Sequence, residues 1–315
     1  MTLAETKAQT FKAGKNMVSF TSDGEKIAAH LFLPADYEVG KNYPAVIVTP
    51  PATGVKEQTA GIYAEALSKK GFLTLTFDPR GWGESGGRPF VVHPDYQVRD
   101  CRNAVNYVMT LDATNKDNVF NLGICMGTGW AAYETAFDTR IKGLAMISPY
   151  LLDLNELVDL MGGSDKFRAT LIAPTLPAAQ SQFESGEDFY IKPVPETEEE
   201  IKMADPISIG MRDYYLPGKP GDVPNWKNKG CLNESYTLYG FSIFNYTKLL
   251  ESTPKYVAYG DQAVSKGGAI KFVNATNPEK VTVIEGEGHF DLYWKPEHVA
   301  RISDEISDFF KEQIK

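Results

Sequence analysis

Short apolar runs alternate with helix-like segments along most of this 315-residue chain, and this alternation limits the possible folds more than any other feature. The segment YPAVIVTPP (43–51) is an almost continuous apolar run, which is typical of a strand buried on both faces of a parallel sheet. Between residues 98 and 109, apolar residues recur every three or four positions, which indicates an amphipathic helix. The repeated strand–helix–strand order predicts an α/β fold with a mostly parallel central sheet and helices on both faces.

The same reasoning locates the other elements of the predicted core. Asp23-Gly24 lies between two alternating runs and predicts a β-hairpin over residues 16–33. Further strands are expected at 72–78, 119–124, 141–148, 255–261 and 280–286, and further helices at 61–71, from about 127, near 266–275 and around 299–309.

The alternation is interrupted between about residue 150 and residue 252. This segment contains several prolines, many aromatic residues and the acidic run PETEEE (195–200), which is best explained as the solvated start of a helix. The strand–helix order then resumes. We therefore expect an α/β core formed by residues 1–149 and 253–315, with residues 150–252 inserted as a cap.

Charge and composition narrow the choice of partners. The net charge of -9 weighs against nucleic acid or an anionic membrane as a partner. No apolar stretch reaches the ~20 residues of a membrane span, and the first sixteen residues lack a signal-peptide core, so we expect a cytoplasmic protein. Three scattered cysteines, Cys101, Cys125 and Cys231, are too few for a disulfide framework or a zinc site. No metal or cofactor is predicted.

One of these cysteines lies in a motif that carries chemistry. Gly123-Ile124-Cys125-Met126-Gly127 has the form G-x-nucleophile-x-G between a predicted strand and a predicted helix. So tight a turn strains the central residue, and the positions two before and two after it must lack bulk. The N–H of Met126 would lie at a helix N-terminus, where it can donate to an oxyanion. A lone cysteine is more often a small buried apolar residue, so the assignment of Cys125 as a nucleophile depends on its partners.

Such a nucleophile needs a histidine after the last strand and an acid after the strand before it. His289, in EGEGHFDLYW, follows the last predicted strand, and His93 is the competing histidine because it leads into a helix from a glycine-rich loop. Asp261 directly follows its predicted strand and is the expected acid, with Asp153 as the alternative. Asp291 is expected to be a structural hydrogen-bond partner.

The second oxyanion donor is expected from the loop that follows the strand at 43–51. The backbone N–H of Ala52 is the first choice and that of Thr53 the second, because the prolines at 50 and 51 have no N–H. Together with Met126, Ala52 would then form the oxyanion hole.

A second glycine motif allows a different function. GWGESG (81–86) follows a strand and fits the G-x-G-x-x-G pattern of dinucleotide-binding sites. However, Asp78-Pro79-Arg80 separates the strand from the glycines, and Pro89 and Pro94 delay the following helix. We therefore expect a tight structural turn at this position.

Four motifs follow one another along the chain: GVKEQTAG (54–61), FDPRGWGESGG (77–87), GICMG (123–127) and GHFDLY (288–293). In this order they resemble the α/β-hydrolase superfamily. Within it they resemble the dienelactone-hydrolase-like branch, which includes the fungal polyketide transferases and their bacterial relatives. The resemblance covers nearly all of the core and is weak in the cap.

The resemblance supports a cysteine nucleophile, because dienelactone hydrolases also have a cysteine in this elbow. Two residues depart from the family pattern. Pro51 corresponds to a glutamate of the dienelactone hydrolases, so their way of activating the thiol does not transfer, and Thr128 replaces a glycine that is frequent among relatives.

These residues predict acyl transfer through a thioester. Cys125, paired with His289, would attack the carbonyl of an ester, lactone or thioester. With water as the second nucleophile the protein is a hydrolase, which we favour because no second binding site is needed. With an alcohol or amine it is an acyltransferase, and an acyl carrier then becomes a possible partner besides the small-molecule acyl substrate. A non-catalytic binding protein on the same scaffold is the third hypothesis, and the oligomeric state is left open.

Overall fold

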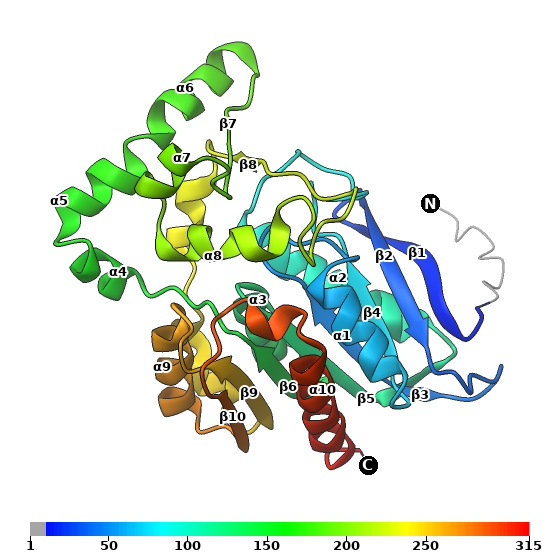
Figure 1. The fold of residues 1–315 in the computed structure, drawn as a ribbon. Coiled ribbons are helices and arrows are strands. Elements are labelled where there is room, and N and C mark those ends of the chain that lie inside the picture. Colours follow the sequence, from blue (N-terminus) through cyan, green and yellow to red (C-terminus); the bar gives the residue numbers. More distant parts are fainter. Residues whose placement is uncertain (1–10, 315) are drawn as a thin grey trace.

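The structure is a computed structural model that describes residues 11–314. Ten of the first sixteen residues, where no signal-peptide pattern was found, lie outside this range. Within it, eight strands form one sheet in the order β1-β2-β4-β3-β5-β6-β9-β10 (Figure 1). The bounds are β1 Gly14–Ser22, β2 Glu25–Leu33, β3 Tyr43–Thr49, β4 Leu73–Phe77, β5 Thr114–Ile124, β6 Ile141–Ile147, β9 Lys255–Gly260 and β10 Lys280–Ile284.

The sheet is mostly parallel, as predicted. Strands β1 and β2 form the expected hairpin, and Asp23 and Gly24 at its turn both have positive φ, 48° and 91°. β2 also pairs antiparallel with β4, and the remaining neighbours pair in parallel. Strands β3 to β6 are almost entirely buried because helices cover both faces, which explains their continuous apolar sequences.

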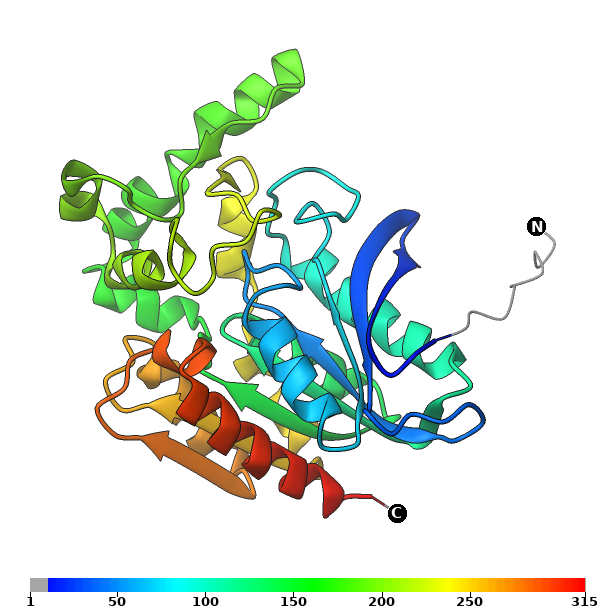
Figure 2. The same ribbon diagram turned by 45° about the vertical axis from the view of Figure 1, so that its right-hand side comes forward.

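Helices pack on both faces of the sheet, and the predicted α/β fold is confirmed. α1 and α10 pack together on one face, whereas α2 and α3 pack on the other (Figure 2). α2 begins four residues earlier than its apolar spacing predicted, because Pro94 supplies its first turn and the side chain of His93 caps it. The helix bounds are α1 Thr59–Ser68, α2 Pro94–Thr110, α3 Gly127–Phe137, α9 Lys266–Thr276 and α10 Pro296–Lys311.

The chain between β6 and β9 adds no strand to the central sheet within the described residues and lies over one end of it (Figure 1). We call this segment the cap; its limits at 150 and 252 stay a prediction. Thr197 and Glu200 form a capping box at the start of α7, so the acidic run begins a helix as expected. The cap contains α4 Leu154–Leu160, α5 Ser164–Phe167, η1 Arg168–Ile172, α6 Thr175–Ser185, β7 Tyr190–Ile191, α7 Glu198–Met203, α8 Pro206–Tyr215, β8 Gly230–Cys231, η2 Ser235–Gly240 and η3 Ile243–Leu250.

No helix in the described range is both long enough and apolar enough to cross a bilayer.

A buried ion pair ties the loop after β4 to helix α2. One carboxylate oxygen of Asp100 lies 2.9 Å from the Arg80 guanidinium, and the other accepts from the backbone N–H of Arg80 at 2.9 Å. Asp100 is fully buried and Arg80 nearly so. Arg80 also pairs with Asp23 at 3.1 Å, but Asp23 is partly exposed, so Asp100 is the only fully buried carboxylate among these partners. Removing Asp100 therefore costs more free energy than losing an exposed pair.

Replacing Asp100 by Ala should therefore lower the free energy of unfolding by about 3–5 kcal/mol, measured by urea denaturation. Asp112, which is exposed just after the same helix, provides the control, and Asp112→Ala should change that free energy by no more than about 0.5 kcal/mol. Equal effects of the two substitutions would show that the Asp100–Arg80 pair does not anchor the loop.

Candidate active site

Cys125 lies at a sharp turn between β5 and α3, with a φ of +59°. Few residues other than glycine adopt this left-handed conformation, and a strained residue of this kind often marks a functional site. The turn is fixed on both sides of the cysteine: its N–H donates to the Ile147 carbonyl at 3.1 Å, and Thr128 Oγ1 donates to its carbonyl at 2.6 Å. The threonine that departs from the family pattern thus helps to hold the elbow.

The two flanking glycines are required by close backbone contacts. A Cβ at Gly123 would lie 2.5 Å from the carbonyl oxygen of Gly127. A Cβ at Gly127 would lie 2.3 Å from the carbonyl oxygen of Pro50, in the loop after β3. Both distances are far below normal contact, so the elbow forms only with small residues at these positions, as the sequence predicted.

The thiol of Cys125 is buried, with 8% of the residue exposed. Burial raises the pKa of this thiol to about 11. Three hydrogen bonds to the sulfur oppose that rise in pKa, one from the hydroxyl of Tyr293 and two from the backbone N–H groups of Met126 and Ala52. Two backbone donors therefore lie beside the sulfur.

His289 is also buried, in the loop between β10 and α10. Its Nε2 lies 3.0 Å from the hydroxyl oxygen of Tyr293, and its Nδ1 lies 2.6 Å from Oγ of Ser265. Burial lowers the pKa of His289 to about 3, so the imidazole is neutral at physiological pH. The hydroxyl of Ser148 donates to the carbonyl of His289 at 2.8 Å and fixes the backbone there.

The two candidate acids have other hydrogen-bond partners. One carboxylate oxygen of Asp261 accepts from the Gly286 N–H at 2.8 Å. Asp153 caps α4 and pairs with Lys271 at 2.9 Å, and this pairing lowers the pKa of the Asp153 carboxyl. The group at Nδ1 of His289 is instead the hydroxyl of Ser265, four residues beyond Asp261.

The two remaining candidates, Asp291 and His93, make hydrogen bonds that stabilise the local backbone. Asp291 accepts from the Gly288 N–H at 2.7 Å and pairs with Lys295 at 3.1 Å, so its expected structural role is confirmed. His93 accepts from the Asp95 N–H at 3.3 Å as the cap of α2.

A buried lysine holds the loop that carries Ala52. Lys56 Nζ lies 2.7 Å from Asp78, 2.7 Å from Glu84 and 2.8 Å from Glu57. Asp78 also accepts from the backbone N–H groups of Lys56 and Glu84, each at 2.8 Å. The turn at 81–86 thus packs against this carboxylate, and a Cβ at Gly83 would lie 2.3 Å from it. The glycines of the second motif make a tight turn that anchors the Ala52 loop.

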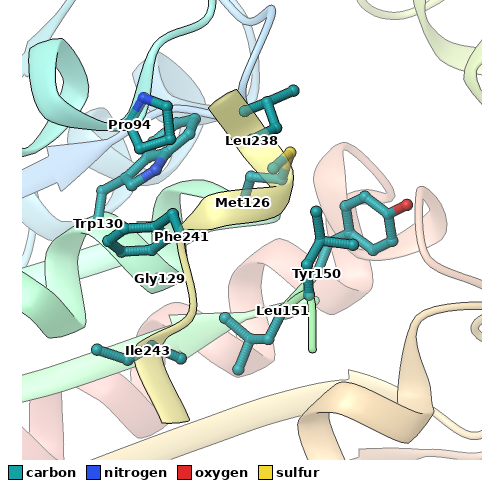
Figure 3. Close-up of a pocket in the computed structure, with 10 residues that line it drawn as sticks. Pro94, Met126, Gly129, Trp130, Tyr150, Leu151, Leu238, Phe241 and Ile243 are labelled. Atoms are coloured by element: carbon teal, nitrogen blue, oxygen red, sulfur yellow. The ribbon is translucent and has the colours of Figure 1, made fainter. Parts of the chain in front are cut away.

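A small cavity of about 10 Å³ lies beside the elbow, close to the least space, roughly 10–15 Å³, that holds one water molecule. Its lining contains no charged residue, and Figure 3 shows side chains of the cap facing Trp130 of α3 across it. The cavity is lined by Pro94, Met126, Gly129, Trp130, Tyr150, Leu151, Leu152, Leu238, Phe241 and Ile243. Within residues 11–314, no group of three or more His, Cys, Asp or Glu side chains is arranged to hold a metal ion.

The sequence matches the family described as alpha/beta hydrolase fold over residues 44–296, which includes the elbow and His289. The chain belongs to this family. Within it, the chain is 29% identical over 301 residues to an uncharacterized protein of Pseudomonas aeruginosa, covering 92% of this chain and 78% of that one. It is 24% identical over 288 residues to a thiohydrolase of Eupenicillium brefeldianum, covering 88% of each chain. It is 25% identical over 301 residues to a polyketide transferase of Penicillium crustosum, covering 93% and 96%.

Solved structures agree with this membership. A hypothetical protein from Pseudomonas aeruginosa is similar with a TM-score of 0.85 and 26% identity, covering 100% of this chain and 98% of that one. The α/β hydrolase GrgF from Penicillium has a TM-score of 0.78 at 20% identity, covering 95% and 98%, which reports the shared fold alone. The predicted resemblance to the fungal polyketide transferases and their bacterial relatives is confirmed.

Two hydroxyl groups of this α/β-hydrolase site were not predicted from the sequence. Ser265 and Tyr293 both contact the imidazole of His289. Serine is too common to single out, whereas Tyr293 follows His289 by four residues within the motif GHFDLY and was quoted there without a role. That spacing, which places two side chains within one short turn, was the available signal.

Substituting Gly127 by Ala should disrupt the elbow, because the added Cβ meets the backbone oxygens of Thr49 and Pro50 at 2.8 and 2.3 Å. We expect the free energy of unfolding to fall by about 1–3 kcal/mol or more in urea denaturation. Gly129 in the same helix is the matched control, since its Cβ would meet only side chains of Leu151 and Phe241, at 3.4 Å. Gly129→Ala should be neutral or stabilising, and a similar loss in both variants would contradict this explanation.

Proposed function

We propose that this α/β-hydrolase cleaves an ester, lactone or thioester through an acyl-enzyme intermediate on Cys125. The observation that supports this most is the strained turn at Cys125, which brings its sulfur to the N–H groups of Ala52 and Met126 and to the Tyr293–His289 pair. A buried structural cysteine would need neither a left-handed backbone nor two backbone donors beside its sulfur.

In the proposed reaction the sulfur attacks the substrate carbonyl, and the C=O electron pair moves onto oxygen. The backbone N–H groups of Ala52 and Met126 hold this oxyanion, and loss of one such donor typically costs about 10²–10³ in rate. His289 accepts the thiol proton and returns it to the leaving group as the bond to that group breaks. Water then attacks the thioester carbonyl while His289 takes one of its protons and passes it to the departing sulfur, which releases the acid and restores the thiol.

Ser265 is the proposed positioning residue for the imidazole. For Nε2 to act as a base, Nδ1 must carry the proton and donate to Ser265 Oγ, 2.6 Å away. A hydroxyl stabilises an imidazolium less than a carboxylate does, which agrees with the lowered pKa of His289. The protonated ring is therefore a short-lived state that forms only during acyl transfer.

The cavity beside the elbow supports an uncharged, apolar acyl group as the substrate portion that lies next to Cys125. A charged group would lose its hydration there without gaining a partner. Side chains of the cap, including Leu238 and Phe241, would cover the acyl chain.

Acyl transfer to an alcohol or amine is the second candidate. One observation favours it: relatives of this chain include a polyketide transferase of Penicillium crustosum and an acyltransferase of Aspergillus calidoustus. Hydrolysis remains the preferred reaction, because it requires no second binding site.

Incubation with activated esters and acyl thioesters should add one acyl group to Cys125, detected by intact-protein mass spectrometry. Cys125→Ala should abolish the adduct and lower turnover by a factor on the order of 10⁴–10⁶. The control is Cys101→Ala, which removes a thiol buried against Thr49 and should keep the adduct. Equal labelling of wild type and Cys125→Ala would favour a non-catalytic binding protein.

Product analysis separates hydrolysis from transfer. With an acyl thioester substrate, the free acid should exceed the ester or amide product even when small alcohols and amines are present at millimolar concentration. The measurement is chromatography of both products over time, with Cys125→Ala as the background. Transfer that outruns hydrolysis would make this protein an acyltransferase.

A further inference from the structure

Tyr293 lies between the two groups that must exchange a proton in the proposed reaction. Its hydroxyl oxygen is 3.0 Å from Nε2 of His289 and is hydrogen-bonded to the thiol of Cys125. No direct bond between that thiol and His289 is present among the interactions of the described residues. The hydroxyl donates to the sulfur when the sulfur is a thiolate. While the sulfur keeps its proton, the same phenol, with one donor proton and two acceptor lone pairs, can instead accept from the S–H and donate to the neutral imidazole.

Resting on the proposed function, we propose that Tyr293 is a catalytic residue that relays the proton between Cys125 and His289. As the sulfur attacks the carbonyl carbon, its proton moves to the oxygen of Tyr293, and the phenol's own proton moves to Nε2. The result is a tetrahedral intermediate with a new sulfur–carbon bond and an oxyanion, beside a neutral tyrosine and an imidazolium.

The protons are also balanced when the relay runs in reverse, as the leaving group departs. The imidazolium returns its proton to the phenol oxygen as the phenol proton moves to the leaving group, whose bond to the acyl carbon breaks. In deacylation, water supplies a proton to the same oxygen as it attacks the thioester, and the sulfur takes a proton back when it leaves. Tyr293 begins and ends each half-reaction as a neutral phenol.

The surroundings of Tyr293 hold its hydroxyl in this position. The residue is fully buried, and its ring packs edge-on against Tyr214 of the cap at 5.1 Å between centroids. The neighbouring Leu292 carbonyl accepts from Tyr63 at 2.6 Å, which ties this stretch to helix α1. The alternative role, a spacer that must swing away before thiol and imidazole meet directly, would require breaking these contacts.

Alkylation of Cys125 by iodoacetamide tests the relay without requiring acyl transfer. Three variants are compared with wild type at pH 7 by intact-protein mass spectrometry: Tyr293→Phe, His289→Gln and the double variant. In each single variant, Cys125 should be alkylated about 10²-fold more slowly than in wild type. The double variant should react no more slowly than either single variant, because all three interrupt the same proton path.

The pH profile gives a second readout that a structural role would not change. Without the relay only free thiolate reacts, and because burial raises the pKa of Cys125 to about 11, the rate should rise about tenfold per pH unit between pH 7 and 10. Wild type should react with a weaker pH dependence over the same range.

Tyr214→Phe is the matched control: it removes a hydroxyl from the ring that packs on Tyr293 and should leave alkylation within about twofold of wild type. An unchanged or faster reaction of Tyr293→Phe, or losses that multiply in the double variant, would overturn the relay in favour of a spacer. If the relay pattern appears but no ester acylates wild type, the proposed hydrolysis fails while the relay stands.

Discussion

The left-handed backbone at Cys125 is the constraint on which the rest of the site depends. It is possible only because Gly123 and Gly127 let β5, α3 and the loop after β3 approach within normal backbone contact. The same close approach brings the N–H groups of Ala52 and Met126 to one sulfur atom. The position of these donors around the sulfur therefore depends on how the sheet packs against α3. A methyl group added at Gly123 or Gly127 would disturb both.

Ion pairs of the buried Lys56 hold the loop after β3, which carries Ala52. Lys56 joins the loop after β3 to Asp78 at the end of β4 and to Glu84 in the glycine turn. Buried ion pairs of this kind contribute little net stability relative to apolar packing, but losing one partner is costly, so they favour a single geometry. Their effect here is to hold the Ala52 loop in register with the elbow.

The sequence predicted the core better than the site. Strands buried on both faces leave continuous apolar runs, and the spacing in G-x-C-x-G reflects backbone contacts that only glycine permits, so both could be predicted. The partners of His289 depend on how the loop after β9 turns: it directs the Asp261 carboxylate to Gly286 and leaves Ser265 at the ring. The cap helices are short and partly exposed, and no single period marked them in the sequence.

The burial of Cys125 next to a nearly filled cavity has a consequence for the oxidation of its thiol. Oxidation of cysteine to sulfenic acid follows thiolate character and access. Here the thiol is protonated at neutral pH and only 8% of the residue is exposed, so we expect peroxide to oxidise it slowly. An acyl group larger than water fits into this cavity beside Met126 only if some of the side chains that line it move. Burial and protonation would thus protect the proposed nucleophile from oxidation between encounters with substrate.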